Sequence, residues 1–362
     1  MPQISTAIET AAAEGRIPAG ITLEYLAQSR DQPAKIAIFC VSALATVIVI
    51  ARCYARLFIV KKFGWDDALA VLTVLIYFPI VALCMVLIDL GSGRHIEYIE
   101  YVLSLTQVDE TEVYDFVMHV LYTTALFTCR LSGLAFYQRL ASCHRKISLA
   151  IKGSAGFLLA AYLVQFLLLL LHCLPVTGLW PYAWQPQINE YQCITWGEVY
   201  VANSVLSLIC DLMMLTLPAL LIHGLHVSRK RKLELSLILF PGVLVLVISS
   251  VRMYLVFIGQ WSSDGSWAYD PMLAIETSEI GSTLIALSTP ALKSLFGTWL
   301  SHLQVSPSEG PSCEAGVKLA HLAPYPGEDT YQVSIGAGEK AMQAGTTPSS
   351  SEDLLLDGSF VQ

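Results

Sequence analysis

Several charged residues interrupt long apolar stretches of this sequence. Arg130, Asp211 and Arg252 lie in three different stretches, and Glu276 and Glu279 lie together in a fourth. A charge in an apolar environment is costly unless it is paired, so such residues form ion pairs, relay protons or bind ligands. These five side chains are the first candidates for chemistry.

An acidic pair in the stretch KKFGWDDALAVL, residues 61–72, is a second candidate. Two carboxylates could carry out acid–base or metal chemistry. However, Asp66 and Asp67 are consecutive residues at the start of an apolar segment, and such neighbours do not face each other on a helix. Carboxylates at a helix start accept hydrogen bonds from open N–H groups and suit the helix dipole. We therefore expect both aspartates to cap a helix.

The composition indicates which elements position these residues. The chain has 362 residues, of which 55% are hydrophobic and 14% charged, whereas a soluble domain has about 25% charged residues. This deficit favours an integral membrane protein, with the lipid bilayer as its main partner. The net charge of −8 gives no indication of nucleic-acid binding.

Seven apolar segments are long enough for transmembrane helices, which need about 20 residues each. Their apolar residues are continuous rather than alternating, which favours helices over the strands of a β-barrel. The predicted fold is an all-α membrane protein, a seven-transmembrane helix bundle. The expected spans are 36–58, 67–90, 115–138, 149–172, 197–222, 234–259 and 271–293.

Lysine and arginine residues in alternate connecting segments predict the orientation. Lys61 and Lys62 follow the first span, Arg145 and Lys146 follow the third, and four basic residues at 229–232 follow the fifth. Because basic residues gather on the cytoplasmic side, the amino terminus is expected outside and the carboxyl terminus in the cytoplasm. The chain is then a multi-pass protein of the plasma membrane or an endomembrane.

Three regions are expected along the chain. Residues 1–34 form an extracellular polar leader, and residues 35–300 form the seven-helix transmembrane domain. Residues 301–362 are rich in Ser, Pro, Gly and Glu, which predicts a disordered cytoplasmic tail. A cytoplasmic signalling partner could bind such a tail.

The cysteines predict one disulfide. Of nine cysteines, Cys173 and Cys193 are the two in the predicted outer loop between the fourth and fifth spans. That loop faces an oxidising compartment, so we expect these two to be bonded. Two free thiols are the alternative.

The depth of each charge follows from its distance along its helix. Arg130 and Asp211 both lie roughly 21–22 Å below the outer surface at about 1.5 Å per residue. We therefore expect an ion pair between them. Arg252 is shallower and is expected to pair with Glu279 or with Glu276.

The shallower polar residues predict an outward-facing pocket if their helices pack as a bundle. The expected pocket residues are Asn203, Arg252, Glu276, Glu279 and His119. A ligand pocket or an acid-lined catalytic cavity is one interpretation. Ion pairs that only join helices are the other, and the sequence leaves both open.

Motifs in seven places resemble one known family. They are FGWDD, GSGRHI, FYQRL, CLPVTGLW, CDLMMLTLPALLI, SSVRMYLV and EIGSTLIALSTPALKSLF, in this order over about residues 36–300. The chain resembles the fungal rhodopsin-domain family, which includes receptor-like proteins and membrane proteins encoded in secondary-metabolite clusters such as the satratoxin cluster. Two departures stand out: Arg130 occupies a position where the family has lysine, and the leader lacks the cysteines of some receptor-like members.

The resemblance does not extend to the chemistry that the family's name suggests. A retinal pigment needs a lysine within its last span, and residues 271–292 contain none. Nor does any metal-ligand spacing occur, so no cofactor and no metal are expected. The Asp-Arg-Tyr and Asn-Pro-x-x-Tyr motifs of animal G-protein-coupled receptors are also missing.

Three functions are compatible with the sequence. A receptor-like protein, or an accessory protein of a biosynthetic cluster, would bind a small-molecule ligand or a pathway intermediate. An integral-membrane cyclase-like enzyme would use Asp211, Glu276 or Glu279 as an acid, although no nucleophile motif is present and a role other than catalysis is favoured. A transporter is the third, and the absence of a visible repeat speaks against it.

Overall fold

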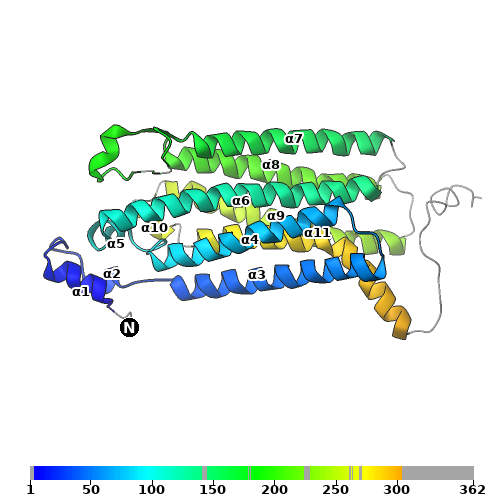
Figure 1. Ribbon diagram of the computed structural model, residues 1–362, viewed down its shortest axis with the longest axis horizontal. Helices are drawn as coiled ribbons and strands as arrows, with labels where there is room; N and C mark the ends of the chain where they lie inside the picture. Colours follow the sequence, from blue (N-terminus) through cyan, green and yellow to red (C-terminus); the bar gives the residue numbers. More distant parts are fainter. Residues whose placement is uncertain are drawn as a thin grey trace, which may run out of the picture. The chain divides into compact units, whose positions relative to one another are not determined.

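The structure, a computed structural model, is mostly helical (Figure 1). It describes residues 4–140, 145–177, 179, 181–223, 229–260, 262, 264–268 and 271–303. Contacts divide the chain into Met1–Ser306 and Pro307–Gln362. Of the predicted tail, residues 304–362 lie outside the described residues.

Long helices occupy all seven segments that the sequence predicts to be apolar spans. Within the described residues, the helices of 24 residues or more are α3 (Asp31–Tyr54), α4 (Trp65–Asp89), α6 (Leu105–Leu140), α7 (Arg145–Leu170), α8 (Trp196–His223), α9 (Arg229–Gln260) and α11 (Met272–Leu303). A π-helical turn, η1 (Ala55–Ile59), continues α3. Helix α6 begins ten residues before the expected span, because its polar first turns continue the helix beyond the apolar segment.

Five helical segments of the described residues are long and apolar enough to cross a membrane. They lie at Leu23–Ile59, Trp65–Asp89, Arg145–Leu170, Gly197–Ala219 and Phe240–Gly259. The two remaining long helices, α6 and α11, carry charged and hydroxyl side chains of the interior. These side chains lower the mean hydropathy of α6 and α11 without shortening them.

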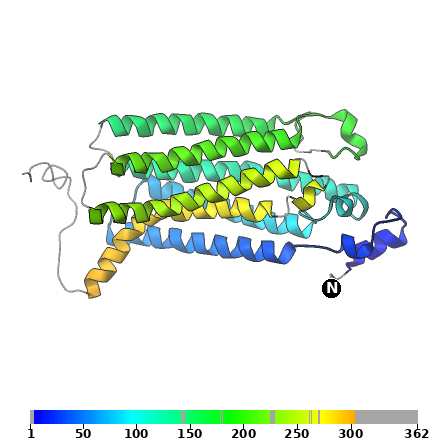
Figure 2. The ribbon, with the colours of Figure 1, turned by 180° about the vertical axis from the view of Figure 1, so that it is seen from behind.

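The seven long helices form a closed ring of neighbours. In the order α3, α4, α6, α7, α8, α9 and α11, each helix contacts the next one, and α11 contacts α3. Helix α6 also contacts α8 and α11 across the ring. The helices run side by side in both views (Figures 1 and 2). The ring closes where α11 approaches α3 at Gly281, whose added Cβ would lie only 2.6 Å from Val41 Cγ1.

The bundle is apolar outside and partly polar inside. Large apolar side chains such as Phe39, Ile50 and Phe257 are more than half exposed on the outer faces. By contrast, Arg52, Arg130, Asp211, Arg252 and Glu279 are almost completely buried. This distribution is the one that a lipid environment requires, since apolar surface is favourable against acyl chains and charges must pair internally.

Short elements gather at the end of the bundle where the chain begins. They are α1 (Thr6–Ala13), α2 (Leu23–Leu26), α5 (Ile96–Tyr101), β1 (Cys173–Leu174), η2 (Pro186–Glu190), β2 (Gln192–Cys193) and α10 (Gly265–Ala268). The predicted polar leader folds here, because Ile8 and Leu26 pack against Tyr98 of α5. Strands β1 and β2 pair antiparallel with Cys173 opposite Cys193. We call this end the cap end.

Candidate functional site

A cavity of about 810 Å³ opens at the cap end of the bundle. Its walls come from α6, α8 and α11 on the bundle side and from α5, α10 and the β1–β2 loop on the cap side. Apolar wall residues include Ile99, Phe116 and Leu273. This volume lies within the range of small-molecule sites, which is about 300–1,000 Å³.

The floor of the cavity is a polar cluster centred on His119 of α6. His119 Nδ1 lies 2.8 Å from the Asp115 carbonyl oxygen and 3.1 Å from the Tyr200 hydroxyl, which donates to Asp115 Oδ2 at 3.1 Å. His119 Nε2 lies 3.4 Å from Glu276 Oε1. Three helices, α6, α8 and α11, therefore converge on this imidazole.

Glu276 is the least satisfied acid of this cluster. It is only 1% exposed, and neither carboxylate oxygen has a hydrogen-bond partner among the described residues. The His119 imidazole lies at ion-pair distance from it. A buried carboxylate without hydrogen bonds is costly, so this group is poised to accept a donor from a bound molecule.

The charged groups of the described wall are acidic. Glu112, Asp115, Glu198 and Glu276 line the cavity, with His119 and His172 as the ionisable nitrogen groups and with no lysine or arginine among the described lining residues. Helix α6 presents Glu112, Asp115 and His119 on one face because they are three or four residues apart.

Two of these acids shift the pKa of Tyr182 in the β1–β2 loop. Burial raises the pKa of the Tyr182 phenol, and the carboxylates of Glu112 and Asp115 raise it further. A neighbouring negative charge disfavours the phenolate in this way. The cavity is therefore a negatively charged environment on its cap side as well as at its floor.

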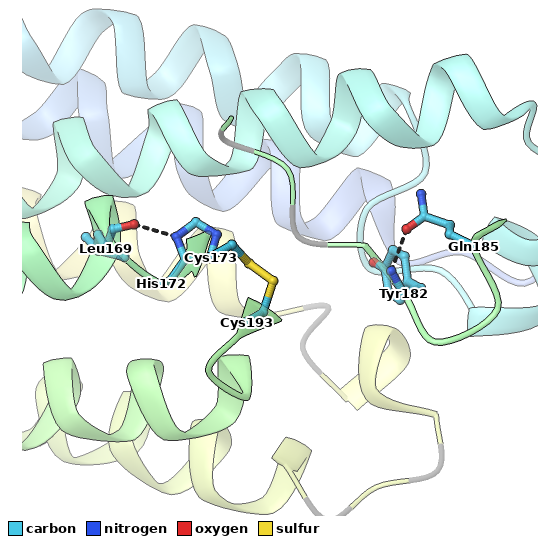
Figure 3. Close-up of a disulfide and its surroundings, with 6 residues drawn as sticks. All are labelled: Leu169, His172, Cys173, Tyr182, Gln185 and Cys193. Carbon is cyan, nitrogen blue, oxygen red and sulfur yellow. Dashed lines mark hydrogen bonds between the residues drawn. A yellow bond between two sulfur atoms is a disulfide. The ribbon is translucent and has the colours of Figure 1, made fainter. Parts of the chain in front are cut away.

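A disulfide holds the loop that covers this part of the cavity. Cys173 and Cys193 are bonded, at a sequence separation of 20. Figure 3 shows the bond beside His172, whose Nδ1 contacts the Leu169 carbonyl oxygen, while Tyr182 and Gln185 lie farther along the loop. This is the cysteine pair that the sequence predicts to be joined.

A second polar cluster lies deeper in the bundle. Arg130 of α6 and Asp211 of α8, the pair expected from their equal depth, are 2.8 Å apart. Ser249 of α9 donates to the other Asp211 oxygen at 2.7 Å. Arg130 also donates to Ser207 Oγ at 2.6 Å.

Glu279 links the Arg130–Asp211 pair to Arg252, the arginine of the second expected ion pair. Arg252 Nε lies 2.8 Å from Glu279 Oε2, and Arg130 Nη2 lies 3.6 Å from Glu279 Oε1. Tyr122 donates to Oε2 at 2.7 Å and Ser207 donates to Oε1 at 3.1 Å. Two arginines and two acids thus form one charge-balanced unit. Arg252 pairs with Glu279, and Glu276 faces His119 instead.

The predicted pocket residues are therefore divided between levels. His119 and Glu276 line the large cavity, and Arg252 and Asn203 join them around a small void of about 20 Å³ below it. The backbone carbonyl oxygen of Asn203 accepts a hydrogen bond from Gln165 Nε2 at 2.9 Å. Glu279 lines neither space.

Asp66 and Asp67 lie at the opposite end of the bundle from the cap. Asp67 accepts the Gly64 N–H at 3.2 Å, as a capping residue does. Both carboxylates also bind one guanidinium, since Arg52 Nη2 is 3.0 Å from Asp66 and Arg52 Nε is 2.9 Å from Asp67. Arg139 pairs with Asp66 as well. This cluster joins α3, α4 and α6.

His95, Glu97 and Asp264 bring their ligand atoms within 4.8 Å of one another, as a metal site would. Their described contacts, however, join the cap elements. The His95 ring stacks between Tyr25 at 4.0 Å and Trp267 at 4.1 Å, and its Nδ1 lies 2.5 Å from Asp264 Oδ2. The cluster thus fastens α2 and α10 to α5 above the cavity.

Sequence reasoning missed the cap and most of the acidic wall. Asp115 and Glu112 could have been found from their spacing to His119, which places the three residues on one face of a helix. Tyr200, Tyr182 and the His95 stack carry no comparable signal, because their contacts depend on how loops fold over the bundle.

Known proteins are similar to the part of the chain that forms most of the helix bundle. Residues 51–298 match the family model described as the fungal rhodopsin domain. A protein of Emericella nidulans named SAT4 family membrane protein is 26% identical over 256 residues, which cover 70% of this chain and 61% of that protein. Fugralins biosynthesis cluster protein 2 of Gibberella zeae is 22% identical over 256 residues, covering 69% of this chain and 62% of that protein.

The match thus spans somewhat less than two thirds of the length of these two relatives. No solved structure matches the chain.

Proposed function

The chain belongs to the fungal rhodopsin domain family of membrane proteins, and from this premise we propose that it binds a small molecule of a secondary-metabolite pathway in its cap-end cavity. The observation that carries the proposal is the cavity of about 810 Å³ with an apolar wall and a polar floor. Pockets of this kind suit ligands that are largely apolar and carry a few polar groups. The name of the Gibberella zeae relative points to a biosynthetic cluster.

The proposed topology has seven membrane spans, with the cap outside and the basic loops in the cytoplasm. The basic residues at 61–62, 145–146 and 229–232 support it through the positive-inside bias. The tail from residue 301 is then cytoplasmic and available to a signalling partner. No retinal is part of the proposal, because residues 272–292 of α11 contain no lysine.

The same cavity could serve a receptor-like protein or an accessory protein of a pathway. The two roles differ in the effect of ligand binding. In a receptor-like protein the occupied cavity changes the cytoplasmic face and alters a response to surfaces or nutrients. In an accessory protein the cavity holds a pathway intermediate, and its loss alters the metabolites themselves. The relative encoded in a biosynthetic cluster favours the accessory role.

An acid-catalysed enzyme is the second candidate, and it depends on one residue. Asp211 and Glu279 lie outside the cavity wall, so they do not reach a bound molecule. Glu276 does line the cavity and has no hydrogen-bond partner among the described residues. An enzyme of this type would therefore use Glu276 as its acid.

The proposal is tested by filling the cavity in the organism that carries the chain. Thr111→Trp places a large ring on the α6 face that lines the cavity, whereas Val117→Trp places the same ring on the outer surface of α6. We expect deletion of the gene to change the metabolite profile, Val117→Trp to restore it and Thr111→Trp to fail at equal protein level.

Full restoration by Thr111→Trp at normal abundance would rule the cavity out as the functional site. Accumulation of a single unprocessed intermediate in the deletion strain and in a Glu276→Gln strain would instead favour the enzyme. Unchanged metabolites with an altered nutrient response would favour the receptor-like role.

A further inference from the structure

The charges that line the cavity restrict the chemical class of the ligand that it can bind. Four carboxylates line the described wall, and the ionisable nitrogens among its described residues are two imidazoles. With both histidines charged, four negative and two positive charges still leave a net charge of −2. Residues 178, 180, 261, 263, 269 and 270, which lie outside the described residues, include no lysine and no arginine either.

The four acids lie at three different levels of burial in this wall. Glu198 is exposed at the start of α8, Glu112 and Asp115 are half-buried on α6, and Glu276 is buried on α11. A path of one sign of charge lined by apolar surface focuses the electric field and attracts molecules of the opposite charge. The acids follow the wall from exposed Glu198 to buried Glu276.

The floor offers the acceptor that a positively charged donor would need. Both oxygens of Glu276 lack hydrogen-bond partners among the described residues, although the side chain is 1% exposed. Its neighbour His119 is at 3.4 Å, and His119 Nε2 also has no hydrogen-bond partner there. A neutral apolar ligand would leave this carboxylate unsatisfied, whereas an ammonium group would donate to it directly.

Aromatic rings accompany the acids. Phe116, Tyr182 and Tyr200 line the cavity, and Tyr200 packs edge-on against His119 with ring centroids 4.7 Å apart. Aromatic faces within about 6 Å attract organic cations through their quadrupoles. An inorganic ion alone would occupy little of a cavity of about 810 Å³ whose lining is largely apolar.

We infer that the ligand of this cavity is an organic cation, an apolar molecule with a protonated amine that is held between Glu276 and the α6 acids. This inference rests on the proposed function, because it assigns a chemical class to the molecule that the cavity binds. It also names Glu276 as the residue that distinguishes an amine from an uncharged analogue of the same shape.

The test uses the full chain in nanodiscs of zwitterionic lipid and three fluorescent probes of one shape. They are dansyl cadaverine, which carries a terminal ammonium, and two counterparts with a hydroxyl or a carboxylate in its place. Binding to the cavity is the part of the fluorescence change that Thr111→Trp abolishes. We expect the ammonium probe to bind at least about tenfold more tightly than the hydroxyl probe, which corresponds to one hydrogen bond to a charged group.

Two substitutions test which acid causes the preference for the ammonium probe. Glu276→Gln keeps the shape of the side chain and should remove most of the tenfold preference for the ammonium probe. Glu110→Gln removes one acid from an exposed position of α6 outside the wall and should leave the preference unchanged. If Glu276→Gln does not fold, the comparison of the probes on the unaltered chain still decides the inference.

The outcomes separate this inference from the proposed function. Equal affinity for the ammonium and hydroxyl probes, with both lost in Thr111→Trp, would overturn the organic cation and leave the small-molecule cavity intact. Tighter binding of the carboxylate probe would overturn the charge argument as well. Absence of Thr111-dependent binding for all three probes would overturn both proposals.

Discussion

Glu276 and Glu279 lie about one turn apart on α11, and their surroundings differ in kind. All four carboxylate oxygens of Glu279 and Asp211 receive hydrogen bonds or ion pairs from Arg130, Arg252 and their neighbours. Glu276 faces the cavity with an imidazole at 3.4 Å and no hydrogen bond from a described residue. Every carboxylate oxygen of the deep network has a partner, although Arg252 Nε and Nη2 make no hydrogen bond to a described residue, whereas both oxygens of Glu276 lack a hydrogen bond.

This difference separates structural charges from charges available for function. Buried ions that satisfy one another fix the contacts between helices and have little capacity left for another molecule. An incompletely satisfied acid beside a cavity has that capacity. Substitutions in the two clusters should therefore affect different measurements, stability in one and binding in the other.

The largest effect is expected for Arg130→Met. It leaves Asp211 buried without its ion-pair partner, which typically costs about 3–5 kcal/mol of stability. Unfolding in nanodiscs, followed by tryptophan fluorescence, should show a much lower midpoint. The double variant Arg130→Met with Asp211→Leu should recover most of the loss, because an apolar pair leaves no unmatched charge. A single variant as stable as the unaltered chain would mean that the pair contributes nothing.

A smaller effect is expected for Glu279→Gln, with Glu276→Gln as its matched control. The new amide presents N–H groups toward the donors Tyr122 and Arg252, so about 2–3 kcal/mol should be lost. The same change at Glu276 removes a buried charge that has no hydrogen bond from a described residue, so it should not lower stability. Equal losses at the two positions would show that the cavity floor is as structural as the network.

The smallest effect is expected for Ser249→Ala. It removes one hydroxyl donor from Asp211 and should cost about 1 kcal/mol. Ser250, the next residue of α9, is exposed and donates only to the Leu246 carbonyl of its own helix. Ser250→Ala should therefore leave the unfolding midpoint unchanged, and a larger loss there than at Ser249 would contradict the assignment.

The positions of the helices were predictable because hydropathy is a property of consecutive residues. All seven expected spans correspond to long helices, and depth along two of them placed Arg130 level with Asp211. Depth follows from the rise of a helix alone. It does not depend on which way the helix is turned.

Rotation about the helix axis was not predictable, and the unexpected contacts depend on it. Whether Arg252 meets Glu276 or Glu279 depends on which face of α11 points at α9, and depth leaves both open. Asp66 and Asp67 are consecutive residues of α4, and the guanidinium of Arg52 binds both. The cap residues are harder still, since Tyr25 and Trp267 meet His95 from segments far apart in the sequence.

The closure of the ring by α11 has a consequence for the order of synthesis. Because the chain is made from its amino end, α6 and α8 are inserted before α9 and α11. Arg130 can therefore pair with Asp211 before the last two helices are present. Arg252 arrives with α9 before Glu279 has been translated. Until the last helix inserts, the nascent protein holds an arginine whose acid does not yet exist, and the arrival of α11 completes charge balance and ring together.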